Sequence, residues 1–347
     1  MIKSDDLILV TGAGGFIGSK VVEKLIEQGF RNIRCFVRPS GRVDFLEKIN
    51  DKLPSGKSLE IFKGNLLSKE DCAKSTTGVA IIYHLAASLE TTFPGSILNC
   101  VVTTRNLLDG AVASGTLKRF VNVSTFAVYS NYDLKRNSVF DETCPIENKF
   151  IERYDPYAYA KVKQEEIVEK YHHEHNVQFV TVRPGVVYGP GRTDLSGRIG
   201  INTFGIFFHL GGNNRIPFTY VDNCAEAIVL AGVKNGIDGK VYNIVDDDLP
   251  TSRQFLRNYK IYFGSFKSIY IPYRIFYLFC YLWEKYSYWS NFQLPPAFNR
   301  RKCSFFWKGN KYSNNKIKSE LGWKPKVSYH EASNIYFDYL NKLGGRN

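Results

Sequence analysis

The feature that most constrains the fold is a glycine-rich turn near the N-terminus. Gly12, Gly15 and Gly18 recur at a spacing of three, after the apolar run 7–10 and before a helical pattern of apolar residues that ends near Gly29. The first glycine permits a tight turn, the second lets backbone N–H groups approach a pyrophosphate, and the third lets a helix pack closely on a strand. The start of the helix adds unpaired donors and a partial positive charge. The pattern therefore predicts a dinucleotide-binding strand–turn–helix unit.

Strand-like and helix-like segments alternate through the first half of the chain. The apolar runs that predict strands are short, and segments with helical periodicity separate them. We expect strands at 7–10, 33–37, 59–62, 80–85, 120–123 and 177–183, and long helices at 98–113 and 157–175. This alternation indicates an α/β fold of the doubly wound type, in which helices cover both faces of a parallel sheet.

The length and the cysteines set broad limits. A chain of 347 residues suits two lobes better than a single core. Its seven cysteines are scattered without a Cys-x-x-Cys pair, which favours reduced, mostly buried thiols, a cytoplasmic location and no structural metal. The N-terminus lacks a basic segment followed by an apolar core, so we expect no signal peptide.

The net charge of +13 is unevenly distributed along the chain. Residues 251–347 carry seventeen Lys and Arg against four acids, so the first 250 residues are neutral overall. Two explanations stay open. The C-terminal lobe either contacts something anionic, such as a phosphorylated substrate or lipid headgroups, or it presents a basic solvated surface without a partner. Nucleic acid is the less favoured partner, and we expect no binding to it at physiological salt.

The residues after the second and third expected strands bear on the cofactor. An acid after the second strand would bond the adenosine ribose, whereas an arginine there accepts a 2′-phosphate. The chain has Arg38 and Arg42 at this place, which favours NADP(H) and leaves NAD(H) as the alternative. In the plain structural explanation, Arg38 stacks on adenine or faces solvent. Asn65 and Leu66, after the third strand, are expected beside the adenine.

Tyr157 and Lys161 form the candidate catalytic pair. Four residues apart on a helix, they share one face, and a nearby cation lowers the pKa of a phenol towards neutral pH. Thr125, after the fifth strand, would hold the substrate oxygen while Tyr157 passes the proton. Tyr159 and Lys163 have the same spacing, but the first pair is preferred because an Asp-Pro pair directly before it marks the start of the helix.

Seven motifs in a fixed order resemble the extended short-chain dehydrogenase/reductase family, which includes NAD-dependent epimerases and dehydratases and 3β-hydroxysteroid dehydrogenases. The resemblance covers about residues 6–340. The motifs are Thr11–Gly18, His84–Ala87, Val123–Tyr129, Pro156–Lys161, Arg183–Pro190, Tyr220–Asn223 and Leu321–Pro325. The resemblance implies a Rossmann doubly wound sheet, a smaller C-terminal α+β substrate-binding domain and a Ser/Thr–Tyr–Lys active site, with the hydroxyl on Thr125 and Ser124 beside it.

The resemblance also implies domain limits and further contacts. The NAD(P)-binding Rossmann domain is expected over 1–190, with its sheet completed by about 216–248, and a basic, aromatic-rich substrate lobe over 191–215 and 249–347. Additional cofactor contacts fall on Gly14, Phe16, Ile17, Leu85, Ala86, Ala87, Pro184 and Val186, and Tyr157 and Lys161 also face the cofactor. The substrate contacts are Ser88, Thr125 and Arg300. Relatives often form homodimers through the helices expected at 98–113 and 157–175.

Some positions depart from the family pattern. The usual Asn-Val-x-Gly-Thr-x-Asn helix motif reads Cys100 to Asn106 here, without its first Asn and its Gly. Asn99 is adjacent, but on a helix we expect it to point about a quarter-turn away. Asn65 and Ala160 stand where Asp and Ser are common. The reactive groups are retained, so these changes are expected to alter cofactor affinity only.

Two reactions compete. Net oxidoreduction at a hydroxyl or ketone of a bulky small molecule is favoured by Arg38 and by Arg183-Pro184-Gly185, where sugar-nucleotide epimerases usually carry Phe-Asn. Nucleotide-sugar epimerisation, dehydration or reduction, as in surface polysaccharide synthesis, is favoured by Arg300-Arg301-Lys302, which could grip a diphosphate. A cofactor-binding sensor without turnover is a third class, but such proteins usually lose the Tyr–Lys pair that this chain retains.

The C-terminal lobe is unusually aromatic, with twenty aromatic residues from Tyr259 to Tyr312. Within it, Ile275 to Trp283 form an uncharged run that is too short to span a bilayer. The run could rest on a membrane face with help from the basic lobe, or it could be an amphipathic helix that covers the core. The second outcome is the commoner one for such helices.

Overall fold

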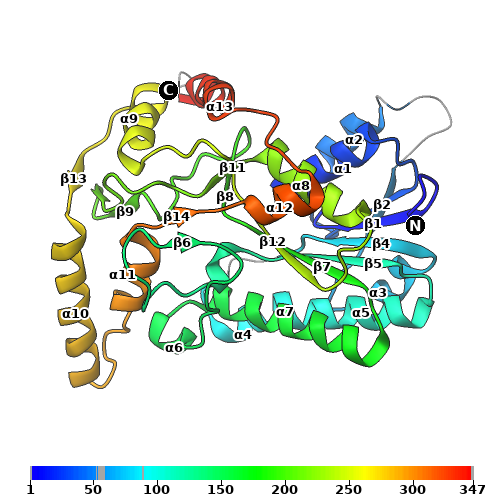
Figure 1. Ribbon diagram of the computed structural model, residues 1–347, viewed down its shortest axis with the longest axis horizontal. Helices are drawn as coiled ribbons and strands as arrows, with labels where there is room; N and C mark the ends of the chain where they lie inside the picture. The colour runs from blue at the N-terminus through cyan, green and yellow to red at the C-terminus, as the bar shows by residue number, and fades with distance from the viewer. Residues whose placement is uncertain (1, 52, 54–58, 88–89, 345–347) are drawn as a thin grey trace.

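In the computed structural model, residues 2–51, 53, 59–87 and 90–344 are described. Seven strands form one parallel sheet in the order β12-β7-β5-β4-β1-β2-β3 (Figure 1). They are β1 (Leu7–Thr11), β2 (Ile33–Val37), β3 (Glu60–Lys63), β4 (Val79–His84), β5 (Arg119–Val123), β7 (Phe179–Pro184) and β12 (Lys240–Ile244). Because β2 and β4 both flank β1, the chain reverses direction across the sheet there and opens a crevice beyond the carboxyl ends of the strands. The Rossmann fold expected from the sequence is confirmed.

Helices cover both faces of this sheet. The helices α1 (Phe16–Glu27), α2 (Asp44–Asn50) and α8 (Val221–Val233) lie on one side, and α3 (Lys69–Thr76), α5 (Thr103–Ser114) and α7 (Pro156–His175) lie on the other (Figure 1). The strands in the middle of the sheet are buried on both faces as a result, and all six residues of β4 are buried, whereas the edge strand β3 is partly exposed. This explains why the sequence of β4 is almost uniformly apolar instead of alternating.

The helix expected at 98–113 is longer and less regular than its sequence indicates. It begins as α4 (Phe93–Ser96), continues as a π-helical turn, η1 (Ile97–Val102), and only then becomes α5, which Gly115 ends in the left-handed conformation. Single π-helical turns inside α-helices are often found at functional sites. Here the turn lies at the segment where the family motif loses its Asn and Gly.

The remaining elements build a C-terminal lobe at the carboxyl end of the sheet. Three small sheets contribute, in the orders β13-β10-β9, β11-β8 and β14-β6. Their strands are β6 (Val139–Phe140), β8 (Val186–Tyr188), β9 (Gly200–Thr203), β10 (Ile206–His209), β11 (Phe218–Tyr220), β13 (Ser268–Tyr270) and β14 (Lys311–Tyr312). The helices are α6 (Phe150–Arg153), α9 (Ser252–Phe263), α10 (Tyr273–Trp289), α11 (Arg300–Trp307), α12 (Asn315–Leu321) and α13 (Tyr329–Gly344).

The lobe also draws on the first half of the chain. β6 pairs with β14, so residues 139–140 lie against a strand that is about 170 positions later in the sequence. The main sheet in turn takes its last strand from the second half of the chain, because β12 pairs with β7. The two lobes therefore exchange segments, and no single position in the sequence separates them.

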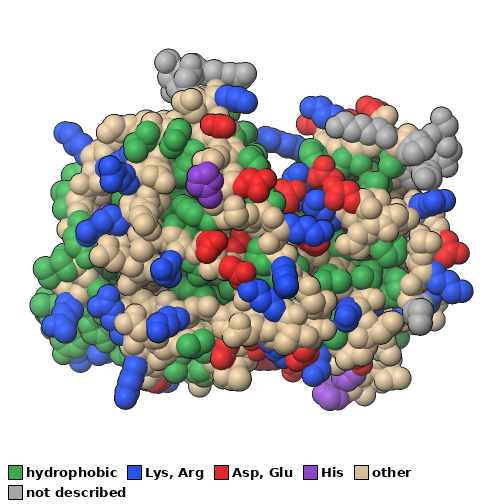
Figure 2. All heavy atoms as spheres, turned by 45° about the horizontal axis from the view of Figure 1, so that its top comes forward, with side chains coloured by type: hydrophobic (Ala, Val, Ile, Leu, Met, Phe, Trp, Pro, Cys, Tyr) green, Lys and Arg blue, Asp and Glu red, His purple; other side chains and the backbone are tan. Residues whose placement is uncertain are grey.

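The surface of the C-terminal lobe differs from that of the sheet. Hydrophobic and basic side chains gather at the left of Figure 2, where α9, β13 and α10 lie, and acidic side chains are few there. All seven cysteines are free and buried, as the scattered spacing predicted. Among the described residues, no helix is both long and apolar enough to cross a membrane.

Candidate active site

The glycine turn lies at the carboxyl end of β1, at the start of α1. Gly12 has a φ of +69°, and a Cβ there would lie 3.0 Å from the backbone nitrogen of Ala86. A Cβ on Gly18 would lie 2.1 Å from the carbonyl oxygen of Gly12. A side chain at either position would force the backbone apart, so both glycines are explained by close approach.

A cavity of about 330 Å³ opens over this turn. Arg38 and Arg42 are exposed at one side of it, and neither forms an ion pair among the described residues. The predicted cofactor contacts that line it are Gly12, Gly14, Gly15, Arg38, Asn65, Leu66, Leu85, Ala86 and Ala87. The donors of a helix start, two unpaired guanidinium groups and a floor without side chains suit an anionic dinucleotide.

Asn99 and Thr103 are among the further residues that line this cavity. The sequence led us to expect Asn99 to point away from the cofactor, and the structure corrects this expectation. The π-helical turn η1 inserts extra backbone per turn, which changes the facing of the residues before Thr103. Asn99 also donates to Glu90 at 3.1 Å. The expectation assumed a regular α-helix through Asn99, and the sequence gives no sign of the π-helical turn.

A second cavity of about 560 Å³ begins at the same turn and extends into the C-terminal lobe. The predicted residues that line it are Gly12, Gly15, Phe16, Ile17, Gly18, Leu85, Ala87, Ser124, Thr125, Tyr157, Lys161, Pro184 and Val186. Gly12, Gly15, Leu85 and Ala87 border both cavities, so the two are parts of one cleft. Segments from β1, β4, β5, α7 and β7 thus bring the predicted cradle and the predicted reactive groups together.

Tyr157 lies in the first turn of α7, which Asp155 caps by accepting from the Ala158 backbone at 3.0 Å. Burial raises the pKa of the Tyr157 phenol, while a hydrogen bond with Thr125 opposes the rise. The Lys161 ammonium is buried and donates to the Val123 carbonyl at 2.8 Å and to Gln164 at 2.9 Å. Lys161 lines the cleft, but the pKa of Tyr157 moves in the direction opposite to the one expected from the sequence, because desolvation dominates.

The other Tyr-x-x-x-Lys pair lies outside the cleft. Tyr159 packs against Phe93 and Phe150, at ring-centroid distances of 5.6 and 5.5 Å. Lys163 is partly exposed and pairs with Glu166 at 2.7 Å. Two positions along a helix rotate a side chain by more than half a turn, so the two pairs face different surroundings.

A buried hydrogen-bond chain joins the glycine turn to Lys161. Thr11 bonds His84 at 2.8 Å, His84 bonds Thr104 at 2.9 Å, and Gln164 donates to Thr104 at 2.8 Å before it accepts from Lys161. Thr104 donates its own proton to the Cys100 carbonyl, so it accepts from His84, and the Nε2–H tautomer follows. Burial lowers the pKa of His84 to about 3, which keeps the ring neutral.

Three other predicted site residues differ in where they lie. Ser124 lines the cleft with its hydroxyl buried and unbonded. Ser88 lies outside the described residues. The prediction for Arg300 is not supported, because this side chain does not line the cleft. Its guanidinium instead binds the Glu284 carboxylate through Nε at 3.0 Å and Nη2 at 3.2 Å.

The sequence did not single out several residues that line the lobe end of the cleft. They are Val187, Arg192, Ser196, Arg198, Phe305 and Phe306. Arg198 is buried, donates to the Phe305 carbonyl at 3.1 Å and lies 4.4 Å from the centre of the Phe305 ring. Arg192 is exposed and lies 5.7 Å from the centre of the Phe16 ring. Arg192, Ser196 and Arg198 lie in an irregular loop, and Phe305 and Phe306 lie in an aromatic run, so none of them has a sequence pattern that indicates a site.

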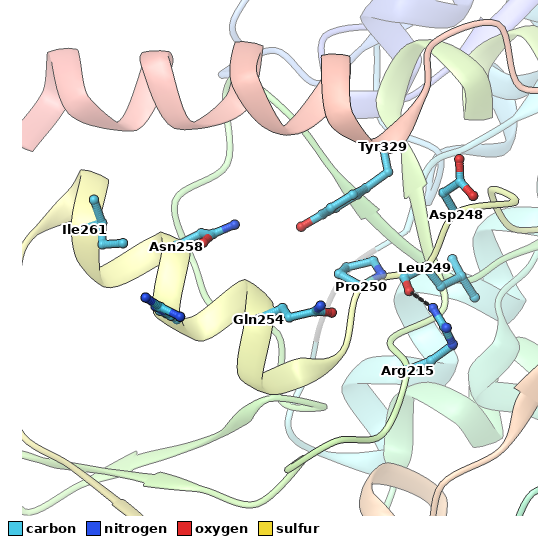
Figure 3. A pocket seen from close by; sticks show the side chains of 9 residues that line it. Arg215, Asp248, Leu249, Pro250, Gln254, Asn258, Ile261 and Tyr329 are labelled. Carbon is cyan, nitrogen blue, oxygen red and sulfur yellow. Dashed lines mark hydrogen bonds between the residues drawn. The ribbon is translucent and has the colours of Figure 1, made fainter.

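A separate cavity of about 500 Å³ lies between α9 and α13 (Figure 3). Tyr329 points into it from the start of α13, and Gln254 and Asn258 face it from α9. Arg215 donates to the Leu249 carbonyl at its edge. None of the residues of the glycine turn or of the Tyr157–Lys161 pair borders this cavity, so we place the candidate active site in the cleft at the sheet.

The order of the strands, the glycine turn at their switch point and the tyrosine at the start of α7 define an enzyme of the extended short-chain dehydrogenase/reductase class. More particularly, the chain belongs to the NAD dependent epimerase/dehydratase family, whose sequence profile matches residues 8–245.

Relatives within this family act on different substrates. A dTDP-D-glucose 4,6-dehydratase from Dictyostelium discoideum is 28% identical over 270 residues, which are 71% of this chain and 61% of that protein. A 3-beta-hydroxysteroid dehydrogenase from Mycolicibacterium neoaurum is 23% identical, with 97% of this chain and 92% of that protein covered. This chain thus spans less than two thirds of the first relative and nearly all of the second.

Solved structures share the fold. A dTDP-glucose 4,6-dehydratase from Streptomyces venezuelae with NAD and TYD bound matches with a TM-score of 0.73 and 21% identity over 97% of this chain and 98% of that chain. A UDP-glucose 4-epimerase from Thermotoga maritima with UDP-glucose matches with a TM-score of 0.70 and 23% identity, over 97% and 99%.

Proposed function

We propose that this protein is an NAD(P)-dependent oxidoreductase that interconverts a hydroxyl and a ketone on a bulky, largely apolar substrate, with Tyr157 as the acid/base. The observation that carries the proposal is that Thr125, Tyr157 and Lys161 line the same cleft as Gly12 and Gly15. A proton-transferring group and a dinucleotide cradle are thereby within one continuous space.

The backbone of Gly14 and Gly15 and the start of α1 would hold the pyrophosphate of the cofactor, and Asn65 and Leu66 would border the adenine. Arg38 and Arg42 support NADP(H) over NAD(H), because both are exposed beside the cradle without an acidic partner among the described residues. A bound nicotinamide supplies the capacity to accept or deliver two electrons with a proton equivalent. The protein supplies orientation and the second proton.

The reacting oxygen of the substrate would be held between the Thr125 hydroxyl and the Tyr157 phenol. Because burial raises the pKa of Tyr157, the phenol keeps its proton at neutral pH in this structure. A protonated Tyr157 can donate to a ketone oxygen as that oxygen gains electrons, and the same group would take the proton back when the reaction runs as an oxidation. Lys161, fixed by Val123 and Gln164, would stabilise the phenolate that remains.

The lobe end of the cleft supports an apolar substrate. Phe305, Phe306 and Val187 line it, together with Arg198. The Arg198 guanidinium is already bonded to Phe305 and Tyr312 and lies over the Phe305 ring, so it is committed to the fold. A substrate diphosphate would therefore meet aromatic rings and a single uncommitted cation, Arg192, at this end of the cleft.

A nucleotide-sugar reaction is the second candidate, and Arg192 is the observation that favours it. This guanidinium borders the cleft, is exposed and forms no ion pair among the described residues. It could pair with one phosphate of a nucleoside diphosphate without breaking a contact of the fold except its position over Phe16.

Cofactor release and substrate panels distinguish these candidates. The purified protein is denatured and its supernatant is tested for nicotinamide dinucleotide, and NADPH and NADH oxidation are then measured with apolar cyclic ketones and with UDP- and dTDP-sugars. We expect no retained cofactor, NADPH oxidation with the ketones and no product from the sugars. Tightly retained NAD together with conversion of a nucleotide sugar would reject our proposal in favour of the second candidate.

A further inference from the structure

The helix α10 is apolar on both of its sides. Its buried side packs against α11 through Phe276, whose ring centre lies 5.2 Å from that of Trp307, and through Cys280 beside Cys303. Half of the helix therefore belongs to the core of the lobe, as the sequence led us to expect. A helix that only covered the core would carry polar residues on its solvent side.

The solvent side of α10 carries large apolar residues instead. At about 100° per residue, six of the exposed apolar side chains fall on a single strip along the helix, and the exposed Tyr281 and Tyr288 lie outside it. The strip consists of Ile275 (61% exposed), Leu278 (56%), Phe279 (41%), Leu282 (58%), Tyr286 (46%) and Trp289 (80%). We call these six residues the α10 strip. A contiguous exposed patch of this kind marks a contact surface more often than an isolated apolar residue does.

Neighbouring segments extend the α10 strip at both ends. Ile269 and Tyr270 of β13 are 51% and 46% exposed and lead into the helix. Phe292 and Leu294 follow it, also exposed, with the Phe292 ring 5.3 Å from that of Tyr288. Tryptophan and tyrosine at such edges suit the headgroup level of a bilayer, because each has an apolar body and a polar tip.

The charges around the α10 strip have one sign. Arg274 and Lys285 are exposed along one edge of it. Residues 251–319 contain thirteen Lys and Arg and a single acid, Glu284. The Glu284 carboxylate is neutralised by Arg300, whose Nε lies 3.0 Å from it. The margin of the molecule that holds α9, β13 and α10 is accordingly green and blue in Figure 2.

We propose that the α10 strip docks this protein on the surface of an anionic lipid bilayer. The apolar side chains would enter the boundary between headgroups and acyl chains, while Arg274 and Lys285 remain among the lipid phosphates. A second copy of the same face is disfavoured as the occupant, because it would bring two basic surfaces together. The cations around the α10 strip thus favour an anionic partner. The apolar side chains of the strip favour a partner with a hydrocarbon interior.

The docked orientation would bring the active site close to the membrane. α11 lies between the two, because α10 packs on its Trp307 while its Phe305 and Phe306 line the cleft. A bound protein would thus hold the lobe end of the cleft one helix away from the lipid. The docking itself does not depend on the proposed reaction, and its test uses no turnover.

Co-sedimentation with vesicles tests the proposal. The full chain is mixed with phosphatidylcholine vesicles and with vesicles in which phosphatidylglycerol replaces part of this lipid. We expect binding to the second set only, and weakening as salt is raised. Arg274→Gln with Lys285→Gln should weaken binding roughly 25-fold, at about fivefold for each cation removed. The combination Leu278→Ser, Leu282→Ser and Trp289→Ser should abolish it.

Matched variants on the opposite side of the molecule serve as controls. Arg31→Gln with Lys48→Gln removes the same net charge from exposed positions near α1 and α2, and Phe45→Ser removes a 40%-exposed apolar residue from α2. Both should bind like the wild type, and far-ultraviolet circular dichroism should show that every variant is folded. Absence of binding to anionic vesicles, or an equal loss in the controls, would overturn the proposal. So would a dimer of the free protein that the serine variants dissociate.

Discussion

The first 250 residues carry equal numbers of basic and acidic side chains, whereas the last 97 carry the whole net charge of +13. In the part of the molecule that contains the seven-stranded sheet, which we call the sheet half, buried charged side chains are hydrogen-bonded to specific partners. The Arg183 guanidinium binds Glu165 through two bonds, of 3.0 and 2.5 Å, and Lys161 binds Val123 and Gln164. In the C-terminal lobe, cations such as Arg274 and Lys285 stand exposed along α10.

Charged side chains therefore have different energetic roles in the two regions. A buried charge without its partner costs several kcal/mol, so in the sheet half single side chains carry large effects. An exposed cation contributes little alone, and its effect is collective and sensitive to salt.

Tyr157→Phe should lower turnover roughly 10²- to 10⁴-fold, since it removes the proposed acid/base group and leaves the glycine turn intact. Cofactor affinity, measured by fluorescence titration, should stay near that of the wild type. Tyr159→Phe is the matched control on the same helix and should keep turnover within about twofold, because Tyr159 packs against Phe93 and Phe150 outside the cleft. Substantial activity in Tyr157→Phe would remove the catalytic assignment.

Glu165→Ala should lower the free energy of unfolding by about 3–5 kcal/mol, since it leaves the buried Arg183 guanidinium without its carboxylate. Urea unfolding followed by fluorescence measures this. The adjacent Glu166→Ala breaks the exposed pair with Lys163 and should cost no more than about 1 kcal/mol. Equal losses in the two variants would contradict the distinction between buried and exposed charges.

Acid should destabilise the protein through its two buried, neutral histidines. Burial lowers the pKa of His84 to about 3 and that of His209 to about 4, whereas the ordinary value is 6.5. Below pH 6.5 the unfolded chain takes up protons that the folded state refuses, so stability falls from pH 6.5 towards each folded pKa. The slope is at most about 1.4 kcal/mol per pH unit for each histidine.

The two histidines compare the halves of the molecule directly, since His84 lies in β4 and His209 in β10. His84→Gln should flatten the dependence of unfolding free energy on pH over 3–6.5, and His209→Gln only over 4–6.5. Chemical denaturation at a series of pH values provides the measurement. Curves that stay parallel to that of the wild type would show that neither ring is held neutral.

Trp289→Ser and Lys285→Gln should each change the free energy of unfolding by less than about 0.5 kcal/mol. Trp289 is 80% exposed, and Lys285 is exposed and forms no ion pair among the described residues. Thermal unfolding checks this. A loss comparable to that of Glu165→Ala would mean that α10 supports the fold through its outer face, and the contrast between the two regions would fail.

Much of the site could be predicted from the sequence, because its turn and its helix start depend on residues that are close together in the chain. The glycine spacing predicted the turn after β1, and the Asp-Pro pair predicted where α7 begins. The π-helical turn at Ile97–Val102 was not predicted, since apolar periodicity does not distinguish it from a regular helix. Arg300 was predicted to bind a diphosphate. Its actual partner, Glu284, lies on another helix, and the sequence does not show that the two helices pack together.

The order of strands and helices, the glycine turn and the excess of positive charge at one end could all be derived from the amino-acid sequence. These follow from near neighbours in the chain, through side-chain periodicity, backbone sterics and composition. Only the folded protein shows which cations have acidic partners and which side of α10 meets solvent. Each of those depends on segments that are distant in sequence and are brought together only by folding.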